Sequence, residues 1–595
     1  MSTTRTTGDG AEHLDDRSTP TGAERHGEPE RPNDLEQLVD AAASWMAQDP
    51  DPETRAELTA ILDGVGTSDP EAVAALRSRF GSRLGFGTAG LRGEVAAGPN
   101  RMNRVLVSQA AAGLAAYLLE RAAPGVRPSV VIGYDGRRKS DVFARDTAEI
   151  MAGAGVRAVL LPRLLPTPLV AYAVRDLGVS AGVMVTASHN PPRDNGYKVY
   201  LGGDDEGSQI VPPADADIAA HIERVAREDD VLELPRSGDY EVADAALVER
   251  YVEATADVAT SAPGERGPLR VVYTAMHGVG WETLSRVLAA AGFEEPVLVD
   301  EQIAPDSAFP TVVFPNPEEV GALDLAYAYA REARADLILA NDPDADRLGV
   351  AIPDRAAPSG FRRLTGNEVG QLLGWRAAER AAAAGVTDGM LSCSIVSSPG
   401  LRAVAEEYGL GFVEALTGFK WISRVPSLVF GYEEALGYLV NPGTVRDKDG
   451  ISAAVAVLDL ASTLAAEGRT LADRLDDFVE RFGAYGSSQI SLRVTDLSRI
   501  RELMAELRAA PPTELGDFPV VSMDDLAAAA GDAPTTDALR FDLGDARVMV
   551  RPSGTEPKLK VYVDAWSTEG DLLARKTAVA EALLRLEADL RARIS

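Results

Sequence analysis

Apolar runs rich in β-branched residues alternate with segments of helical spacing along most of this 595-residue chain. The runs are short and end at glycines or polar loops, which favours buried strands. The segments between them repeat apolar residues three or four positions apart, which favours helices. The pattern recurs three times, with strands beginning near residues 128, 156 and 180, near 269, 296 and 335, and near 389, 410 and 427. A helical segment lies between the first two strands of each copy, which is the βαβ pattern of parallel sheets.

The two ends of the chain differ from this repeat. Residues 1–34 are rich in Gly, Pro, Thr and charge and almost lack apolar residues, so we expect a disordered tail. The segments LEQLVDAAASWM and PEAVAALRSRF, within residues 35–80, show helical spacing. From about residue 485, SSQISLRV, LRFDLGDARVMVRPSG and KLKVYVDAW indicate antiparallel strands, and residues 571–594 indicate an amphipathic helix.

These patterns predict an α/β protein, with three related α/β domains and a C-terminal α+β domain around one central cleft. The expected divisions are a disordered tail over 1–34, a helical lead-in and domain 1 over 35–265, domain 2 over 266–365, domain 3 over 366–480, and domain 4 over 481–595. In each α/β copy the third strand ends in a polar loop, and ligands bind at the carboxyl ends of strands in open α/β sheets. We therefore expect the three loops to meet at the cleft.

Net charge, cysteine content and hydropathy limit the classes of partner and the cellular location that we expect. The net charge of −32 makes nucleic acid and anionic membranes poor partners, so an anionic substrate must be drawn by a local basic site. The single cysteine, Cys393, excludes an intrachain disulfide. No apolar stretch is long enough to span a membrane, and the N-terminus has no apolar signal region, so the expected location is the cytoplasm. A monomer or a dimer is expected.

The first polar loop presents a hydroxyl group. The strand Ala181–Ala187 ends at Ser188 and His189, and two prolines then forbid a helix. Ser188 could simply cap a turn, or it could act as a nucleophile. A Ser–His hydrolase fits this sequence less well, because the side chains of adjacent residues seldom face each other and the G-x-S-x-G turn is missing.

The second loop, NDPDADR over 341–347, carries three carboxylates. In an extended segment Asp342, Asp344 and Asp346 share one face, and three close carboxylates repel unless a cation lies between them. Hard oxygen ligands from few residues suit Mg²⁺. An EF-hand is excluded, because Arg347 occupies the required glycine position and Pro353 the position of the bidentate Glu. An acidic surface turn is the alternative.

Other loops offer anion and hydroxyl contacts. RPSGTEPKLKVY, residues 551–562, combines a guanidinium, hydroxyls and the backbone N–H groups around a glycine, which suits phosphate. The glycine-rich LGFGTAGLRGEV, residues 84–95, presents Arg92. The third copy offers Lys420, Lys448 and the paired Glu433 and Glu434, whose carboxylates suit sugar hydroxyls. One nucleophile, one Mg²⁺ site and phosphate contacts together describe phosphoryl transfer on a sugar phosphate.

At these motifs the chain resembles the α-D-phosphohexomutase superfamily, the phosphoglucomutases and phosphomannomutases. TASHNPP, DPDADR, GYEEALG and RPSGTEP match its active-serine, metal, sugar and phosphate loops, in that order. The resemblance implies that Ser188 is the phosphoserine and that its phosphate joins Asp342, Asp344 and Asp346 at Mg²⁺. By the same match, the groups around the reacting hydroxyl are Arg92, His189 and Lys198, and Lys198 or Lys448 is the candidate proton carrier. The implied substrate contacts are Arg347, Thr417, Gly418, Lys420, Glu433, Glu434, Arg551, Ser553, Gly554, Thr555 and Lys558.

The resemblance implies a phosphoglucomutase that interconverts glucose 1-phosphate and glucose 6-phosphate, with glucose 1,6-bisphosphate as activator and intermediate. The paired glutamates favour the glucose branch over the mannose branch, although Ala435 stands where the family usually has Ser. A phosphomannomutase, a phosphopentomutase, a phosphatase and a non-catalytic sugar-phosphate sensor remain as alternatives.

Overall fold

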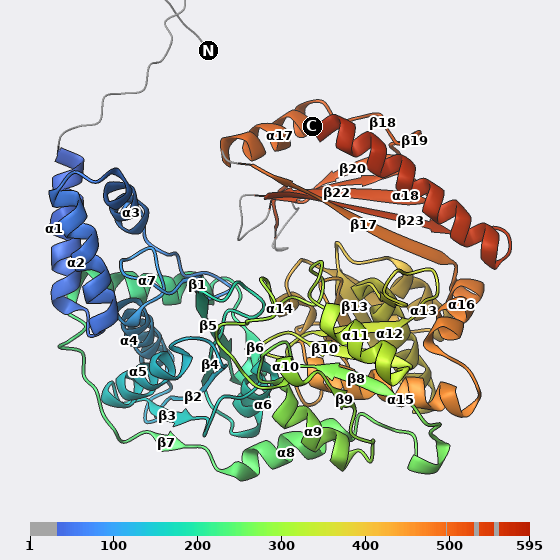
Figure 1. Ribbon diagram of the computed structural model, residues 1–595, viewed down its shortest axis with the longest axis horizontal. Coiled ribbons are helices and arrows are strands. Elements are labelled where there is room, and N and C mark those ends of the chain that lie inside the picture. Colours follow the sequence, from blue (N-terminus) through green and yellow to red (C-terminus); the bar gives the residue numbers. More distant parts are fainter. Residues whose placement is uncertain (1–32, 495–496, 529–534, 553–557, 595) are drawn as a thin grey trace, which may run out of the picture.

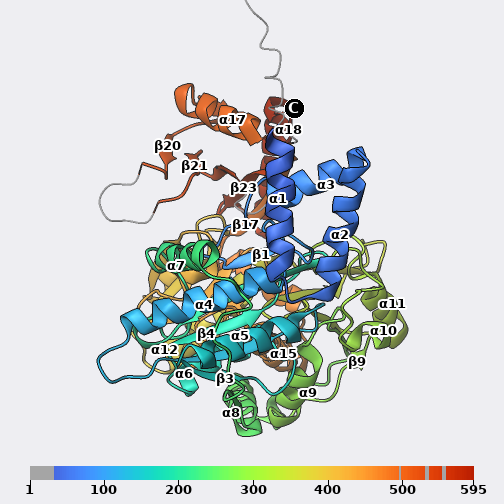
Figure 2. The same cartoon turned by 90° about the vertical axis from the view of Figure 1, so that its left-hand side faces the viewer.

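The computed structural model describes residues 33–494, 497–528, 535–552 and 558–594. The predicted tail lies outside these residues except for its last two positions, which belong to the first helix. The helical lead-in is formed by α1 (Asn33–Gln48), α2 (Pro52–Gly66) and α3 (Pro70–Phe80). Asp51 and Asp69 cap α2 and α3, each accepting a hydrogen bond from a backbone N–H of the first turn, and a proline follows each cap. Trp45, Leu58 and Leu76 pack these helices beside the first sheet (Figure 2).

The first sheet has the strand order β1-β5-β4-β2-β3-β7, with β6 paired to β5. Its elements are β1 (Leu91–Glu94), α4 (Arg104–Arg121), β2 (Ser129–Tyr134), α5 (Ser140–Gly153), β3 (Arg157–Leu160), α6 (Thr167–Asp176), β4 (Ala181–Val185), β5 (Asp194–Leu201), η1 (Gly203–Asp205), β6 (Ser208–Gln209), α7 (Ala214–Glu228), β7 (Glu241–Val242), α8 (Ala245–Ala256) and η2 (Pro263–Glu265). Strand β2 is parallel to β3 and β4, whereas β5 is antiparallel to β4.

The second and third sheets repeat this arrangement. The second has the order β12-β11-β10-β8-β9 and the third β14-β13-β15-β16, so each places its first strand between the second and third and adds an antiparallel fourth. The second comprises β8 (Val271–Thr274), α9 (Gly280–Ala290), β9 (Val297–Leu298), α10 (Asp300–Ile303), α11 (Asp324–Ala333), β10 (Leu337–Asn341), β11 (Leu348–Pro353) and β12 (Phe361–Arg363). The third comprises α12 (Gly366–Ala383), β13 (Met390–Ser394), α13 (Gly400–Tyr408), β14 (Gly411–Ala415), α14 (Phe419–Ile422), β15 (Leu428–Glu433), β16 (Gly437–Leu439), α15 (Gly450–Ala466) and α16 (Leu471–Phe482).

The C-terminal part is an antiparallel sheet with helices on one face. Its order is β17-β23-β22-β21-β20, with a small hairpin of β18 and β19 beside it. The elements are β17 (Ala484–Arg493), α17 (Leu497–Ala509), β18 (Glu514–Leu515), β19 (Phe518–Pro519), β20 (Ser522–Asp525), β21 (Leu539–Asp542), β22 (Ala546–Pro552), β23 (Lys558–Ser567) and α18 (Leu572–Ile594). Helix α18 covers β17 and β23, on the side of the sheet away from the three α/β sheets (Figure 1).

The predicted fold class, three related α/β units and a C-terminal α+β unit, is confirmed. One hydrophobic core runs through all three α/β units, and the buried helix α15 contacts α8, α9, α12 and the strands β10 and β11. Within the described residues, no single helix is long and apolar enough to cross a membrane. The pair α15 and α16 passes by length and composition together but bends by 92°.

Candidate active site

Ser188 lies three residues beyond the carboxyl end of β4 in a tight, buried turn. Its φ of +51° is left-handed, and its backbone N–H donates to Thr186 Oγ1 at 2.9 Å. Its hydroxyl donates to Asp342 Oδ2 at 3.0 Å, across to the second sheet. The Ser188 hydroxyl therefore points toward the loop of residues 341–347, which carries the three carboxylates and is called the acidic loop.

The three carboxylates of Asp342, Asp344 and Asp346 converge as expected, with one oxygen of each within 4.8 Å of the others. All three are completely buried, which argues against an acidic surface turn. Their loop is fixed from both sides, because Thr167 N donates to Asp344 O at 2.9 Å and Gly450 N to Ala345 O at 3.2 Å.

Three cationic side chains, Lys198, Lys448 and Arg347, lie close to this cluster. Lys198 Nζ, from β5, lies 2.8 Å from Asp344 Oδ2 and from Asp346 Oδ2. Lys448 Nζ lies 3.3 Å from Asp346 Oδ2. Asp344 Oδ1 and Asp346 Oδ1 are buried and have no hydrogen-bond partner among the described residues. Two unsatisfied carboxylate oxygens beside a third carboxylate fit a hard divalent cation such as Mg²⁺.

Burial and mutual repulsion set the titration of the cluster. Burial, together with Asp344 and Asp346, raises the pKa of Asp342 well above its usual value. Burial acts in the same direction on Asp346, but Lys198 and Lys448 outweigh it and lower its pKa. The carboxylates of Asp344 and Asp346 in turn outweigh the effect of burial on Lys198 and raise the pKa of Lys198.

Arg347 connects the acidic loop to the first and third sheets. Its Nη1 donates to His189 Nδ1 at 2.6 Å, and its Nη2 lies 3.8 Å from Glu433 Oε1 at the end of β15. Burial and the Arg347 and Arg92 guanidinium groups hold the pKa of His189 well below its usual value, so the imidazole is neutral and Nδ1 can accept this bond. Arg92 Nη1 reaches Asn190 Oδ1 at 3.3 Å.

The two glutamates of the third loop have different surroundings. Glu433 faces Arg347, whereas Glu434 Oε2 accepts hydrogen bonds from the hydroxyls of Ser394 at 2.9 Å and Ser397 at 3.1 Å. The Glu434 carboxylate is thus engaged within its own unit, which leaves Glu433 as the carboxylate nearer the acidic loop.

A second cationic region lies between the third unit and the first. Thr417 and Gly418 precede the short helix α14, and Lys420 Nζ from this helix donates to Thr88 Oγ1 in the glycine-rich loop. Burial lowers the pKa of Lys420, and the charges of Arg424 and Arg551 lower it further.

Arg551 brings the C-terminal unit to this region. It lies near the end of β22, and its buried Nε has no hydrogen-bond partner among the described residues. Lys558 begins β23. The predicted contacts Ser553, Gly554 and Thr555 lie outside the described residues.

Sequence reasoning missed two polar residues that hold the site. The Thr167 hydroxyl, at the start of α6, donates to Asp344 Oδ2 at 2.6 Å. Arg137 donates to the carbonyl oxygens of Ser188 and Asn190, both at 2.6 Å. Thr167 directly follows a proline, and Arg137 lies in a polar loop after β2. Both positions match the polar loops at the ends of the other strands, which is the signal that could have identified them.

Comparison with known proteins gives the family. Four models of the phosphoglucomutase/phosphomannomutase family match in order: the alpha/beta/alpha domains I, II and III over residues 83–229, 249–355 and 365–482, and the C-terminal domain over 491–582.

Two curated relatives and one solved structure agree with this match. A "Probable phosphomannomutase" of Haemophilus influenzae is 55% identical over 465 residues, covering 78% of this chain and 93% of the relative. A "Probable phosphoribomutase" of Schizosaccharomyces pombe is 36% identical, covering 89% of this chain and 94% of the relative. The crystal structure of a phosphoglucomutase/phosphomannomutase family protein from Burkholderia thailandensis has the same fold, with a TM-score of 0.63 and 21% identity, covering 86% of this chain and 97% of that one. The chain therefore belongs to the α-D-phosphohexomutase superfamily, whose members are mutases of the isomerase class.

Proposed function

We propose that the protein is a phosphoglucomutase that interconverts glucose 1-phosphate and glucose 6-phosphate through phosphorylated Ser188. The observation that carries the proposal is the position of the Ser188 hydroxyl, 3.0 Å from Asp342 Oδ2 and beside two unsatisfied carboxylate oxygens. A phosphate on Ser188 would lie where a cation held by the Asp triad could share it.

The reaction consists of two phosphoryl transfers. In the first, the bond between Ser188 Oγ and phosphorus breaks as the free sugar hydroxyl forms a bond to that phosphorus. The hydroxyl loses its proton to a base, and Ser188 Oγ gains one. The bound bisphosphate then reorients, and its other phosphoryl group returns to Ser188 by the reverse of these steps. The sugar leaves with its phosphate moved, and the enzyme is again phosphorylated.

Mg²⁺ held by Asp342, Asp344 and Asp346 would neutralise charge on the phosphoryl group. The surrounding side chains position it. Arg347 keeps His189 and Glu433 together above the acidic loop. Lys198 and Lys448 lie at the carboxylates and are the candidates for moving the proton of the sugar hydroxyl.

The non-reacting phosphate would bind near Lys420 and Arg551. Two cations at one place repel each other, and an anion between them removes the repulsion. This local positive charge would allow a chain of net charge −32 to bind an anionic substrate. Arg551 comes from the C-terminal unit, so substrate binding would draw that unit toward the third one and exclude water from the phosphoserine.

A phosphopentomutase is the second candidate, and the surroundings of Glu434 favour it. Because Ser394 and Ser397 hold that carboxylate and Ala435 has no hydroxyl, Glu433 is the main acceptor for sugar hydroxyls. A pentose presents fewer hydroxyls than a hexose. The S. pombe relative carries the name of a ribose phosphate mutase.

The test is mutase activity toward glucose, mannose and ribose 1-phosphates with Mg²⁺ and a trace of the matching bisphosphate. The proposal predicts the highest kcat/KM for glucose 1-phosphate and no turnover by Ser188→Ala. Higher kcat/KM for ribose 1-phosphate would make the protein a phosphopentomutase with the same chemistry. Steady release of inorganic phosphate without isomerised sugar would make it a phosphatase.

A further inference from the structure

One buried arginine, Arg137, binds the backbone of the loop between β4 and β5, residues 186–193, which carries Ser188 and is called the serine loop. Arg137, in the loop between β2 and α5, has a side chain only 1% exposed. Its Nη2 donates to the carbonyl oxygens of Ser188 and Asn190, both at 2.6 Å, and its Nη1 to those of Pro191 at 2.9 Å and Asp194 at 3.1 Å. Four charge-assisted bonds from one rigid guanidinium fix the path of the loop that presents the Ser188 hydroxyl.

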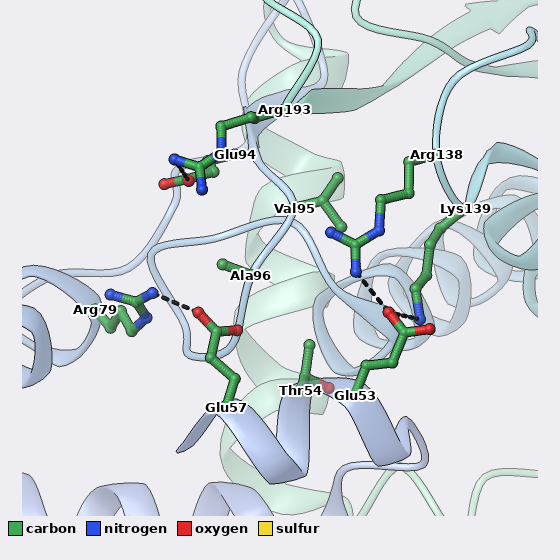
Figure 3. Close-up of a pocket in the computed structure, with 10 residues that line it drawn as sticks. All are labelled: Glu53, Thr54, Glu57, Arg79, Glu94, Val95, Ala96, Arg138, Lys139 and Arg193. Carbon is green, nitrogen blue, oxygen red and sulfur yellow. Dashed lines mark hydrogen bonds and ion pairs between the residues drawn. The ribbon is translucent and has the colours of Figure 1, made fainter. Parts of the chain in front are cut away.

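The next two residues of this loop point the other way, toward the N-terminal helices. Lys139 Nζ lies 2.5 Å from Asp51 Oδ2, at the N-cap of α2. It also lies 3.2 Å from Glu53 Oε2 on α2, and Arg138 Nη2 lies 2.5 Å from the same Glu53 oxygen (Figure 3). The side chains of Lys139 and Asp51 are only 13% and 4% exposed, whereas those of Arg138 and Glu53 are more than half exposed. Exposed pairs contribute little, so the shielded pair of Lys139 and Asp51 carries the contact.

Two further observations describe the surroundings of this contact. Lys139 has a φ of +64°, a conformation that costs a residue with a side chain about 1 kcal/mol and persists only where its surroundings impose it. A cavity of about 460 Å³ lies between α2, the end of α3, the end of β1 at Glu94 and the loops that carry Arg138 and Arg193 (Figure 3). Most residues that line this cavity are polar or charged, whereas an apolar cluster with Leu58, Ala97 and Val105 joins the helices to the first unit beside it. The helices α1 to α3 precede residue 83, where the match to the family's first domain begins.

We propose that the three N-terminal helices hold the serine loop in place, an arrangement that we call the brace. Asp51 binds Lys139, and this ion pair fixes the β2–α5 loop. Arg137 in that loop binds the carbonyl groups of the serine loop. Lys139 and Asp51 are thus positioning residues for a hydroxyl that neither of them touches. The inference rests on the proposed function only in assigning catalysis to Ser188.

The test compares amide hydrogen exchange and kinetics in full-length Lys139→Met. Loss of the ion pair should raise the opening of the serine loop, so exchange in a peptide spanning residues 186–195 should accelerate about tenfold. Within this peptide, the N–H of Asn190 donates to Ala187 O, and that bond exists only while the loop keeps its shape. In turnover, kcat should fall about threefold to tenfold while KM changes by less than about twofold, because orientation of the reacting group is lost and substrate contacts are kept.

Matched variants separate bracing from general destabilisation. Arg138→Met removes the neighbouring exposed pair and should change exchange in the peptide by less than about twofold. Asp51→Asn removes the charge but keeps the cap of α2, and should reproduce the effect of Lys139→Met. Asp69→Asn makes the same change at the cap of α3 and should leave the serine loop unchanged. The double variant of Asp51→Asn and Lys139→Met should be no worse than Lys139→Met alone.

The outcomes distinguish the brace from the proposed function. Unchanged exchange over residues 186–195 in both Asp51→Asn and Lys139→Met, with full activity, would overturn the brace. Additive effects of the two substitutions would overturn it as well. If Lys139→Met does not fold, Asp51→Asn decides alone. A wild-type protein without mutase activity would refute the proposed function, and the exchange experiment would still test the brace.

Discussion

We expect Gly90→Ala to displace strand β1, which carries Arg92, away from strand β5 in the active site. Gly90 has a φ of +73°, and a Cβ there would lie 1.8 Å from Tyr197 O. Real Cβ contacts are essentially never closer than 3.0 Å, so the backbone must move by at least 1.2 Å. Gly90 immediately precedes β1, in which Leu91 pairs with Tyr197 and Arg92 with Gly196. The added methyl group therefore pushes Arg92 and its strand away from β5, the strand that carries Lys198.

The expected loss follows from this displacement. A shift of about 1 Å in positioned groups costs about 100-fold in rate, so kcat/KM should fall by about that factor. The left-handed conformation of alanine should add about 1–2 kcal/mol of destabilisation, seen as a lower Tm. Gly87→Ala is the matched control, because a Cβ there has no atom within 4 Å and the φ is not in the left-handed region. If Gly90→Ala keeps the kcat/KM of Gly87→Ala, the close approach of β1 to β5 does not position the site.

The remaining predictions concern three positions. Thr167→Val should raise the Mg²⁺ concentration for half-maximal activity about tenfold or more, because it removes the hydroxyl that orients Asp344, whereas Thr167→Ser should not; an equal requirement in both would contradict this role. Ala435→Ser should raise the kcat/KM ratio of glucose over ribose 1-phosphate about twofold to tenfold, and no change would separate this position from sugar choice. Burial raises the pKa of Asp449 to about 6, above its unfolded value, so the folded protein binds the extra proton between pH 4 and 6 and loses stability as the pH rises through 6. Asp449→Asn keeps the cap of α15 and should abolish this loss of about 3 kcal/mol; equal pH profiles of Tm in variant and wild type would refute it.

Local signals in the sequence were enough to predict most of the fold. Each predicted strand of the three copies is present, because an apolar run closed by a glycine or a polar loop is a short-range pattern. The fourth strand of each sheet was not predicted. Strand β5 is an example: it contains Tyr197, Lys198 and Val199, and its place is fixed by antiparallel pairing with β4 and β1. The pairing with β4 crosses only a short loop, but the pairing with β1 joins Leu91 to Tyr197, which are distant in the sequence, and it leaves a weaker local pattern.

The same limit applies to the site. The spacing of Asp342, Asp344 and Asp346 predicted that their carboxylates converge, and they do. The contact between Thr167 and Asp344 joins residues 177 positions apart, and no local pattern encodes it. From the motif of paired glutamates, both Glu433 and Glu434 were predicted to contact the sugar. Ser394 at the end of β13 and Ser397 just after it bind Glu434 alone, and only the packing of neighbouring strands shows this difference.

The central claim is that Ser188 carries the phosphoryl group. The most direct measurement is mass spectrometry of the protein after incubation with glucose 1,6-bisphosphate and Mg²⁺, followed by peptide mapping and by the mutase assay. The account predicts one phosphoryl group on the peptide that contains Ser188, no added mass in Ser188→Ala, and no mutase activity in that variant. A phosphoryl group on another residue, or full activity in Ser188→Ala, would contradict it.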